Sequence, residues 1–165
     1  MGCDIHLFLE YKAGDGPWTQ DKLHKLDESD PEFSRVHELP DVRNYELFSV
    51  LAGVRGDGAE PKGLPEDCSD MIKHASDLWD SDGHSHSYTS LSDFKKALKT
   101  VGYKLLKKGQ KSDLDALWDA SYANIVRYAE EQCIRLRLDL ESEKMILGQD
   151  INTTVQCRFV YFFDN

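Results

Sequence analysis

Residues 3–12 read CDIHLFLEYK and alternate between two kinds of side chain, as is typical of a β-strand. One set is apolar: Cys3, Ile5, Leu7, Leu9 and Tyr11. The other set is mostly polar: Asp4, His6, Phe8 and Glu10. Because successive side chains of a strand point to opposite faces, the first set is expected to face a core. A turn at residues 13–16 and a short edge strand at residues 17–19 are expected to follow.

The end of the chain has a similar pattern. Residues 153–163 are rich in β-forming residues, and one face of this second strand carries Val155, Cys157, Phe159, Tyr161 and Phe163. We expect the first and last strands to be neighbours in one sheet. This pairing would place Asp164 close to Asp4.

Between these strands the sequence predicts about four helices. Apolar residues recur at helical spacing in residues 42–52, 70–79, 91–100 and about 113–138. Residues that commonly cap helices precede these segments, at Asp41, Ser69, Ser90 and Ser112. Residues 20–40 show no clear period and are expected to form a long excursion. The fold class is therefore α+β, a single domain over residues 1–165 with an antiparallel sheet that contains both terminal strands and is covered by helices.

The amino-acid composition argues against several classes of function. Thirty acidic against twenty basic residues give a net charge of −10, which argues against nucleic acid as a partner. The sequence has no apolar run long enough to span a membrane and no leader-like start, so we expect a cytoplasmic protein without a membrane partner. The four cysteines have no paired spacing and are expected to be small buried side chains.

A polar loop is expected at residues 80–87, which read DSDGHSHS between two helical segments. His84 and His86 stand two apart in this loop, and Asp4 and His6 stand two apart on the first strand. Together these four side chains offer nitrogen and oxygen ligands for a divalent metal such as zinc or manganese. A metal held there would activate water, so one hypothesis is a metal-dependent hydrolase or phosphodiesterase.

A second set of residues indicates a binding site for a phosphorylated, nucleotide-like ligand. Arginine forks suit phosphate, aromatic rings suit a base, and histidine or serine suits sugar and phosphate oxygens. A helix N-terminus also favours an anion, and one is expected close to Arg43. The residues proposed for this pocket are Arg43, Asn44, Tyr45, Arg55, Trp79, His84, Ser85, His86 and Ser87.

The sequence also resembles a group of small proteins encoded by bacteriophages and prophages. The resemblance rests on MGCDIH at residues 1–6, RNY at 43–45, GVR at 53–55, GLP at 63–65, HSHS at 84–87 and FDN at 163–165, with residues 104–147 outside it. It implies a phage setting in the host cell and a single small domain, and it brings no activity. Phage proteins of this kind often counter host defence, so the leading hypothesis becomes a nucleotide-binding protein that sequesters a host immune signal.

A third hypothesis is a protein-binding inhibitor that acts through its acidic surface. It requires one continuous acidic face, which the alternating charges of the sequence do not indicate. The sequence is also compatible with a homo-oligomer.

Overall fold

The computed structural model describes residues 2–21, 43–111 and 121–165. Its centre is a four-stranded antiparallel sheet with strand order β2-β1-β4-β3. The strands are β1 (Ile5–Ala13), β2 (Trp18–Gln20), β3 (His84–Ser90) and β4 (Val155–Phe163). The first and last strands are neighbours over their whole length, from Ile5 opposite Phe163 to Ala13 opposite Val155, which confirms the predicted pairing.

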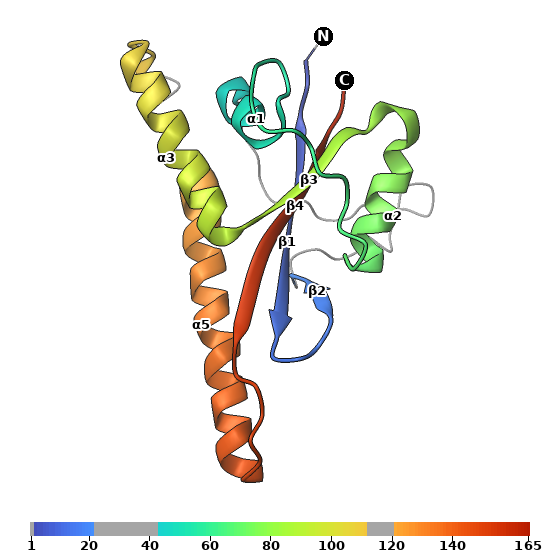
Figure 1. Ribbon diagram of the computed structural model, residues 1–165, viewed down its shortest axis with the longest axis vertical. Coiled ribbons are helices and arrows are strands. Elements are labelled where there is room, and N and C mark those ends of the chain that lie inside the picture. The colour runs from blue at the N-terminus through green and yellow to red at the C-terminus, as the bar shows by residue number, and fades with distance from the viewer. Residues whose placement is uncertain (1, 22–42, 112–120) are drawn as a thin grey trace.

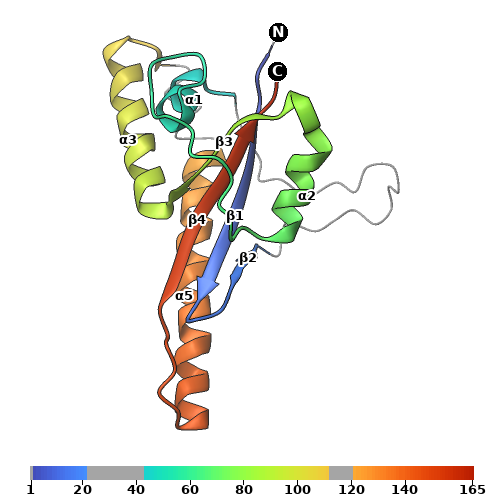
Figure 2. The same ribbon diagram turned by 45° about the vertical axis from the view of Figure 1, so that its right-hand side comes forward.

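Four α-helices in the described residues flank this sheet: α1 (Tyr45–Ala52), α2 (Asp70–Trp79), α3 (Leu91–Lys107) and α5 (Ser121–Leu147). A single turn of 3-10 helix, η1 (Asp80–Asp82), joins α2 to β3. Helices α1, α3 and α5 cover one side of the sheet and α2 covers the other (Figure 1). We call these two sides the α5 face and the α2 face. The turned view in Figure 2 shows α5 running beside the sheet and projecting beyond it.

The α5 face carries the larger core, and its strand residues are those that the alternation predicts. The apolar sets of β1 and β4 both point into it, from Cys3 to Tyr11 and from Cys157 to Phe163. From the helices, Phe48, Phe94 and Tyr122 are fully buried against them. Burial of these side chains is the main force that holds three helices on this face, because each large apolar side chain contributes about 1.5–3 kcal/mol.

The α2 face is buried as well, and it contains an ion pair. Phe8, Ile72 and Phe162 belong to a second, smaller core under α2. Beside this core, Arg158 of β4 donates from Nε to Glu10 Oε1 at 2.9 Å, and Glu10 is completely buried. The second oxygen of Glu10 accepts a hydrogen bond of 2.7 Å from the backbone of Ser69, which precedes α2. The ion pair therefore fixes the start of α2 to the sheet.

Three boundaries differ from the sequence prediction. The first helix begins after Asn44, whose side chain accepts a hydrogen bond from Leu47 N, whereas Asp41 lies outside the described residues. Helix α3 does not stop before Gly102 but continues to Lys107, because Gly102 is buried and packing compensates the low helix propensity of glycine. Helix α5 continues to Leu147, beyond the buried stripe, because its last turns are rich in helix-forming residues.

One further difference from the sequence prediction bears on the position of the site. Residues 84–87, expected in a loop, belong to β3 and pair with β4, so the polar segment completes the sheet. The N-cap at Ser112 and the excursion after residue 21 lie outside the described residues. Within the described part of the chain, no helix is long and apolar enough to cross a membrane.

Candidate functional site

Arg43 and Arg55 are held at the two ends of α1. Asn44 caps the start of the helix, and Gly53 ends it in the left-handed conformation, with a φ of 66°. The chain then folds back so closely that a Cβ on Gly58 would lie 1.6 Å from the carbonyl oxygen of Ser49. Glycine is required at this contact, since any side chain would push the loop off the helix. The loop thus places the Arg55 guanidinium 4.8 Å from the centre of the Tyr45 ring.

A cavity of about 630 Å³ lies between α1, this loop and the end of α3. Four basic side chains line it: Arg43, Arg55, Lys104 and Lys108. Its remaining lining includes Asn44, Tyr45 and the acidic side chains of Glu46 and Asp57. We call this space the α1–α3 cavity. Its volume falls in the range of about 300–1,000 Å³ that is typical of small-molecule sites.

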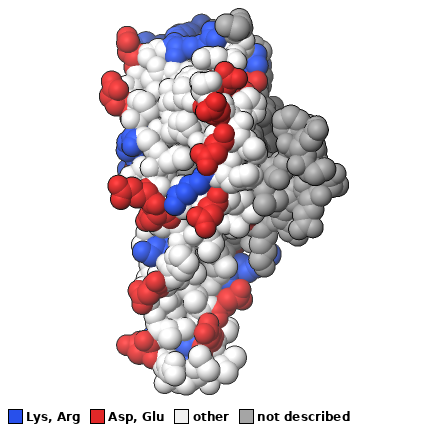
Figure 3. Space-filling model, turned by 90° about the vertical axis from the view of Figure 1, so that its right-hand side faces the viewer, with Lys and Arg blue, Asp and Glu red and all other residues white. Residues whose placement is uncertain are grey.

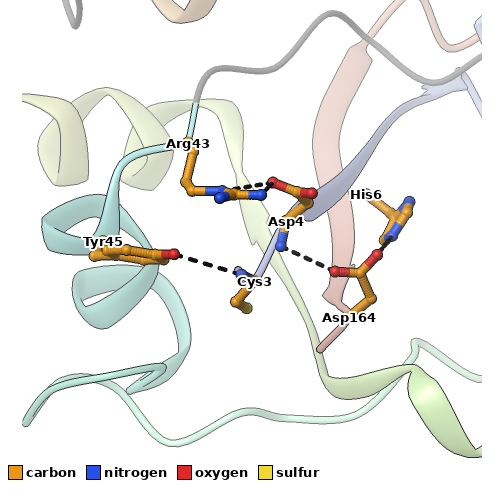
Figure 4. A network of polar contacts seen from close by, with 6 residues as sticks. All are labelled: Cys3, Asp4, His6, Arg43, Tyr45 and Asp164. Atoms are coloured by element: carbon orange, nitrogen blue, oxygen red, sulfur yellow. Dashed lines mark hydrogen bonds and ion pairs between the residues drawn. The ribbon is translucent and has the colours of Figure 1, made fainter. Parts of the chain in front are cut away.

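A polar network connects this cavity with the sheet (Figure 4). Arg43 donates from Nε to Asp4 Oδ1 at 2.8 Å, and its Nη2 lies 2.7 Å from the same oxygen. The backbone of Asp4 donates to Asp164 Oδ1 at 3.0 Å, and Asp164 Oδ2 accepts from His6 Nε2 at 3.2 Å. The predicted approach of Asp164 to Asp4 is therefore confirmed. Tyr45 joins the network through its hydroxyl, which accepts a hydrogen bond of 3.4 Å from Cys3 N.

The α2 face contains a separate group of aromatic and imidazole rings. The His6 ring packs on Phe162 at 4.7 Å between centroids and on Trp79 at 4.3 Å. His86 stacks on the same phenylalanine at 5.0 Å, and its Nε2 is hydrogen-bonded to Ser76 Oγ at 2.8 Å. Burial lowers the pKa of His86, and the nearby His84 lowers it further. His86 is therefore a neutral, packed side chain at neutral pH.

A β-bulge separates the two histidines of the HSHS segment. His84 pairs with Phe163, whereas Ser87 pairs with Tyr161, so β3 has one extra residue here. The bulge includes Ser85, whose φ of 53° lies in the left-handed region. His84 consequently lies beside Phe163, and His86 beside Phe162, which point to opposite faces of β4.

This geometry does not gather the metal ligands that the sequence suggested. Asp4 is paired with Arg43, and His6 with Asp164. His84 is hydrogen-bonded to Ser85 through Nδ1, at 2.9 Å, and is on the other face from His86. Among the residues that the structure describes, no group of three or more His, Cys, Asp or Glu side chains is arranged to hold a metal ion. The hydrolase hypothesis thus loses the donor set on which it was based.

The residues proposed for nucleotide binding divide into two groups. Arg43, Asn44, Tyr45 and Arg55 do line one cavity, as the sequence suggested. Trp79 and His86 lie on the α2 face, beyond the sheet, so the expected single pocket does not form. His84, Ser85 and Ser87 are also absent from the lining of the α1–α3 cavity. Ser87 is buried and accepts a hydrogen bond of 3.2 Å from Lys62 N.

Comparison of the chain with family models, with curated proteins and with solved structures gives no match.

The sequence prediction missed the two lysines of the cavity. Lys104 and Lys108 belong to a lysine-rich segment at the end of α3, which offered no chemical pattern beyond its charge. They stand four residues apart and so lie on one side of the helix. Lys108 is paired with Glu46 of α1, whereas Lys104 forms no ion pair with any residue in the described ranges. Only the packing of α3 beside α1 brings them to Arg43 and Arg55.

The acidic-surface hypothesis receives no support from the visible α2 side. Acidic side chains stand there in separate groups, with basic and uncharged side chains between them (Figure 3). Several acids elsewhere are paired with lysines, such as Glu130 with Lys95 at 2.6 Å. The homo-oligomer stays a prediction, to which the exposed Met145 and Ile146 at the end of α5 give a surface that can be tested.

The half-buried His86 predicts a loss of stability in acid. Its folded-state pKa is below the ordinary value of 6.5, so the unfolded chain takes up a proton that the folded chain does not. This contribution to stability is present above 6.5 and is lost as the pH falls. We expect the free energy of unfolding, measured by urea denaturation, to fall more between about pH 7.5 and about pH 5.5 for the native chain than for His86→Gln. Equal losses in the two proteins would show that His86 does not titrate as the structure implies.

Proposed function

We propose that the protein binds a small phosphorylated, nucleotide-like ligand in the α1–α3 cavity. The observation that carries this proposal is the convergence of four basic side chains and a tyrosine on one cavity of about 630 Å³. The chain has a net charge of −10, so a cavity with four basic and two acidic side chains is a local exception. Such a site attracts an anion in spite of the overall charge.

The charges of the cavity are disposed for phosphate. Arg43 already contacts Asp4, which raises the pKa of this arginine and keeps its guanidinium charged. Lys108 already forms an ion pair with Glu46. The ammonium of Lys104 is not engaged in an ion pair within the described ranges, and Arg55 lies over the Tyr45 ring. We assign Lys104 and Arg55 as the main phosphate ligands, because both line the cavity and Arg55 can donate to phosphate from its place beside the Tyr45 ring. Arg43 is assigned as a side chain fixed by Asp4 at the edge of the site.

Tyr45 is suited to the other end of a nucleotide. It is 37% exposed although it starts a helix whose other aromatic residue, Phe48, is fully buried. The exposed ring offers an apolar surface on which a base can stack. Its hydroxyl is held by Cys3 N, so the ring is fixed before a ligand arrives.

The resemblance to phage proteins supports one extension of this proposal. The protein would act in the cytoplasm of the host cell and sequester a nucleotide signal of host defence, releasing it unchanged. Sequestration, unlike catalysis, predicts that the bound nucleotide is recovered chemically unchanged.

The experiment is a calorimetric titration with cyclic nucleotides, ADP-ribose and adenosine, followed by heating and chromatography of the released ligand. We expect at least one phosphorylated compound to bind and to be recovered intact, and adenosine to bind at least about tenfold more weakly, as the loss of charge-assisted contacts predicts. Recovery of a cleaved compound would make the protein an enzyme. If no compound binds, or adenosine binds equally well, the proposal is wrong.

A further inference from the structure

A second hollow lies at the edge of the sheet, beside the beginning of β4, and differs in character from the α1–α3 cavity. It is about 880 Å³ in volume and lies between α3, α5 and the beginning of β4, and Trp18, Tyr88 and Arg158 line its other side. Its floor is formed by apolar and aromatic side chains, among them Leu91, Cys133, Val155 and Cys157. We call it the Cys133 groove. None of the residues considered above for phosphate binding lines it.

The rim of the groove is basic. Lys95, Lys96 and Lys99 all belong to α3 and line its edge. Lys95 is paired with Glu130 across the groove, and Lys96 is 3.5 Å from Asp93. Lys99 forms no ion pair or side-chain hydrogen bond with any other residue that the structure describes, although it is exposed beside an apolar floor. The groove thus combines apolar surface with a lysine whose charge no residue of the described ranges neutralises.

Two cysteines lie together in the floor. Cys133 of α5 and Cys157 of β4 are both reduced, and the hydrogen bond between their thiols lowers the pKa of Cys133 while it raises that of Cys157. Cys133 is also the most accessible of the four cysteines, since the other three are buried. It is therefore the thiol that a reagent should reach first, and it lines the groove.

We propose that the Cys133 groove binds an amphipathic organic anion, a carboxylate with an extended apolar chain. The carboxylate would pair with Lys99 at the rim, and the chain would lie on Leu91, Val155 and the two thiols. Charge complementarity selects this occupant over a neutral apolar one, because the lysine rim gains nothing from the latter. An apolar floor equally disfavours a hydrated, highly charged nucleotide, so the two hollows are matched to different ligands.

The test measures how fast N-ethylmaleimide labels Cys133, with decanoate or decanol present below micelle-forming concentrations and peptide mapping to identify the labelled thiol. We expect decanoate to slow labelling about fivefold or more through occupancy of the groove, and decanol to do so only at about tenfold higher concentration. The proposal fails if decanoate gives no protection. It also fails if decanol protects equally, since binding would then depend on the apolar floor alone.

Charge variants on α3 separate this site from a general effect of charge. Lys99→Glu is expected to raise the concentration of decanoate needed for protection about tenfold or more, by replacing an attraction with a repulsion. Lys107→Glu changes the same charge on the same helix outside the groove and should leave protection unchanged. Lys99→Gln serves if the glutamate variant does not fold. Equal effects at positions 99 and 107 would contradict the proposal.

Discussion

Replacing Arg158 with leucine is expected to cost about 3–5 kcal/mol of the free energy of unfolding, because it strands the carboxylate of Glu10. Glu10 is completely buried, and Arg158 is 7% exposed. The guanidinium also lies 3.9 Å from the centre of the Trp18 ring and 3.0 Å from Asp67.

Urea denaturation followed by circular dichroism measures this loss. The double variant Glu10→Leu/Arg158→Leu should be less destabilised than the sum of the two single variants, since it leaves no unpaired charge. Lys95→Leu removes one partner of the exposed pair with Glu130 and should cost no more than about 1 kcal/mol. Additive effects of the two buried substitutions would show that Glu10 and Arg158 are not coupled as the structure has them.

Replacing Arg55 and Lys104 together with alanine is expected to weaken binding of the tightest phosphorylated ligand about a hundredfold or more. Each charge-assisted hydrogen bond contributes about 1.5–3 kcal/mol, and about 1.4 kcal/mol corresponds to a factor of ten. The two side chains come from different elements, the loop after α1 and helix α3, yet line one cavity. A joint loss would therefore identify the cavity rather than one residue.

The matched control removes the same number of charges elsewhere. Lys73→Ala/Lys107→Ala changes two exposed lysines that do not line the α1–α3 cavity, and it should leave the affinity within about threefold, because salt screens distant surface charges. If the control loses as much affinity as the cavity variant, the ligand senses the overall charge of the protein. Both variants are measured by calorimetry in the same buffer.

The sequence was sufficient for the main architecture because the two terminal strands carry strong alternation. Their apolar sets point to the α5 core as the period of two requires, and the pairing of these strands brings Asp164 to Asp4. The alternation did not reveal that the opposite face is also buried. His6, Phe8 and Glu10 look like a solvent-facing set, and only α2, packed through Ile72, explains their burial.

The candidate site was only half predictable. Residues 43–45 and Arg55 are close in sequence and joined by one helix, so their proximity follows from local structure. The HSHS segment was expected to complete the same pocket, but it forms an edge strand whose bulge divides its histidines between two faces. A single extra residue causes this division, and no pattern in the sequence marks it. Lys104 reaches the cavity only because α3 packs beside α1, and the spacing of residues in the sequence does not predict this packing.

The most direct measurement of the central claim is the crystal structure of the protein with the tightest phosphorylated ligand of the panel. We predict that the phosphate lies within hydrogen-bonding distance of Arg55 and Lys104 and that the base lies against Tyr45, inside the α1–α3 cavity. A ligand bound instead beside Trp79 and His86 on the α2 face, with the α1–α3 cavity empty, would contradict the proposed site.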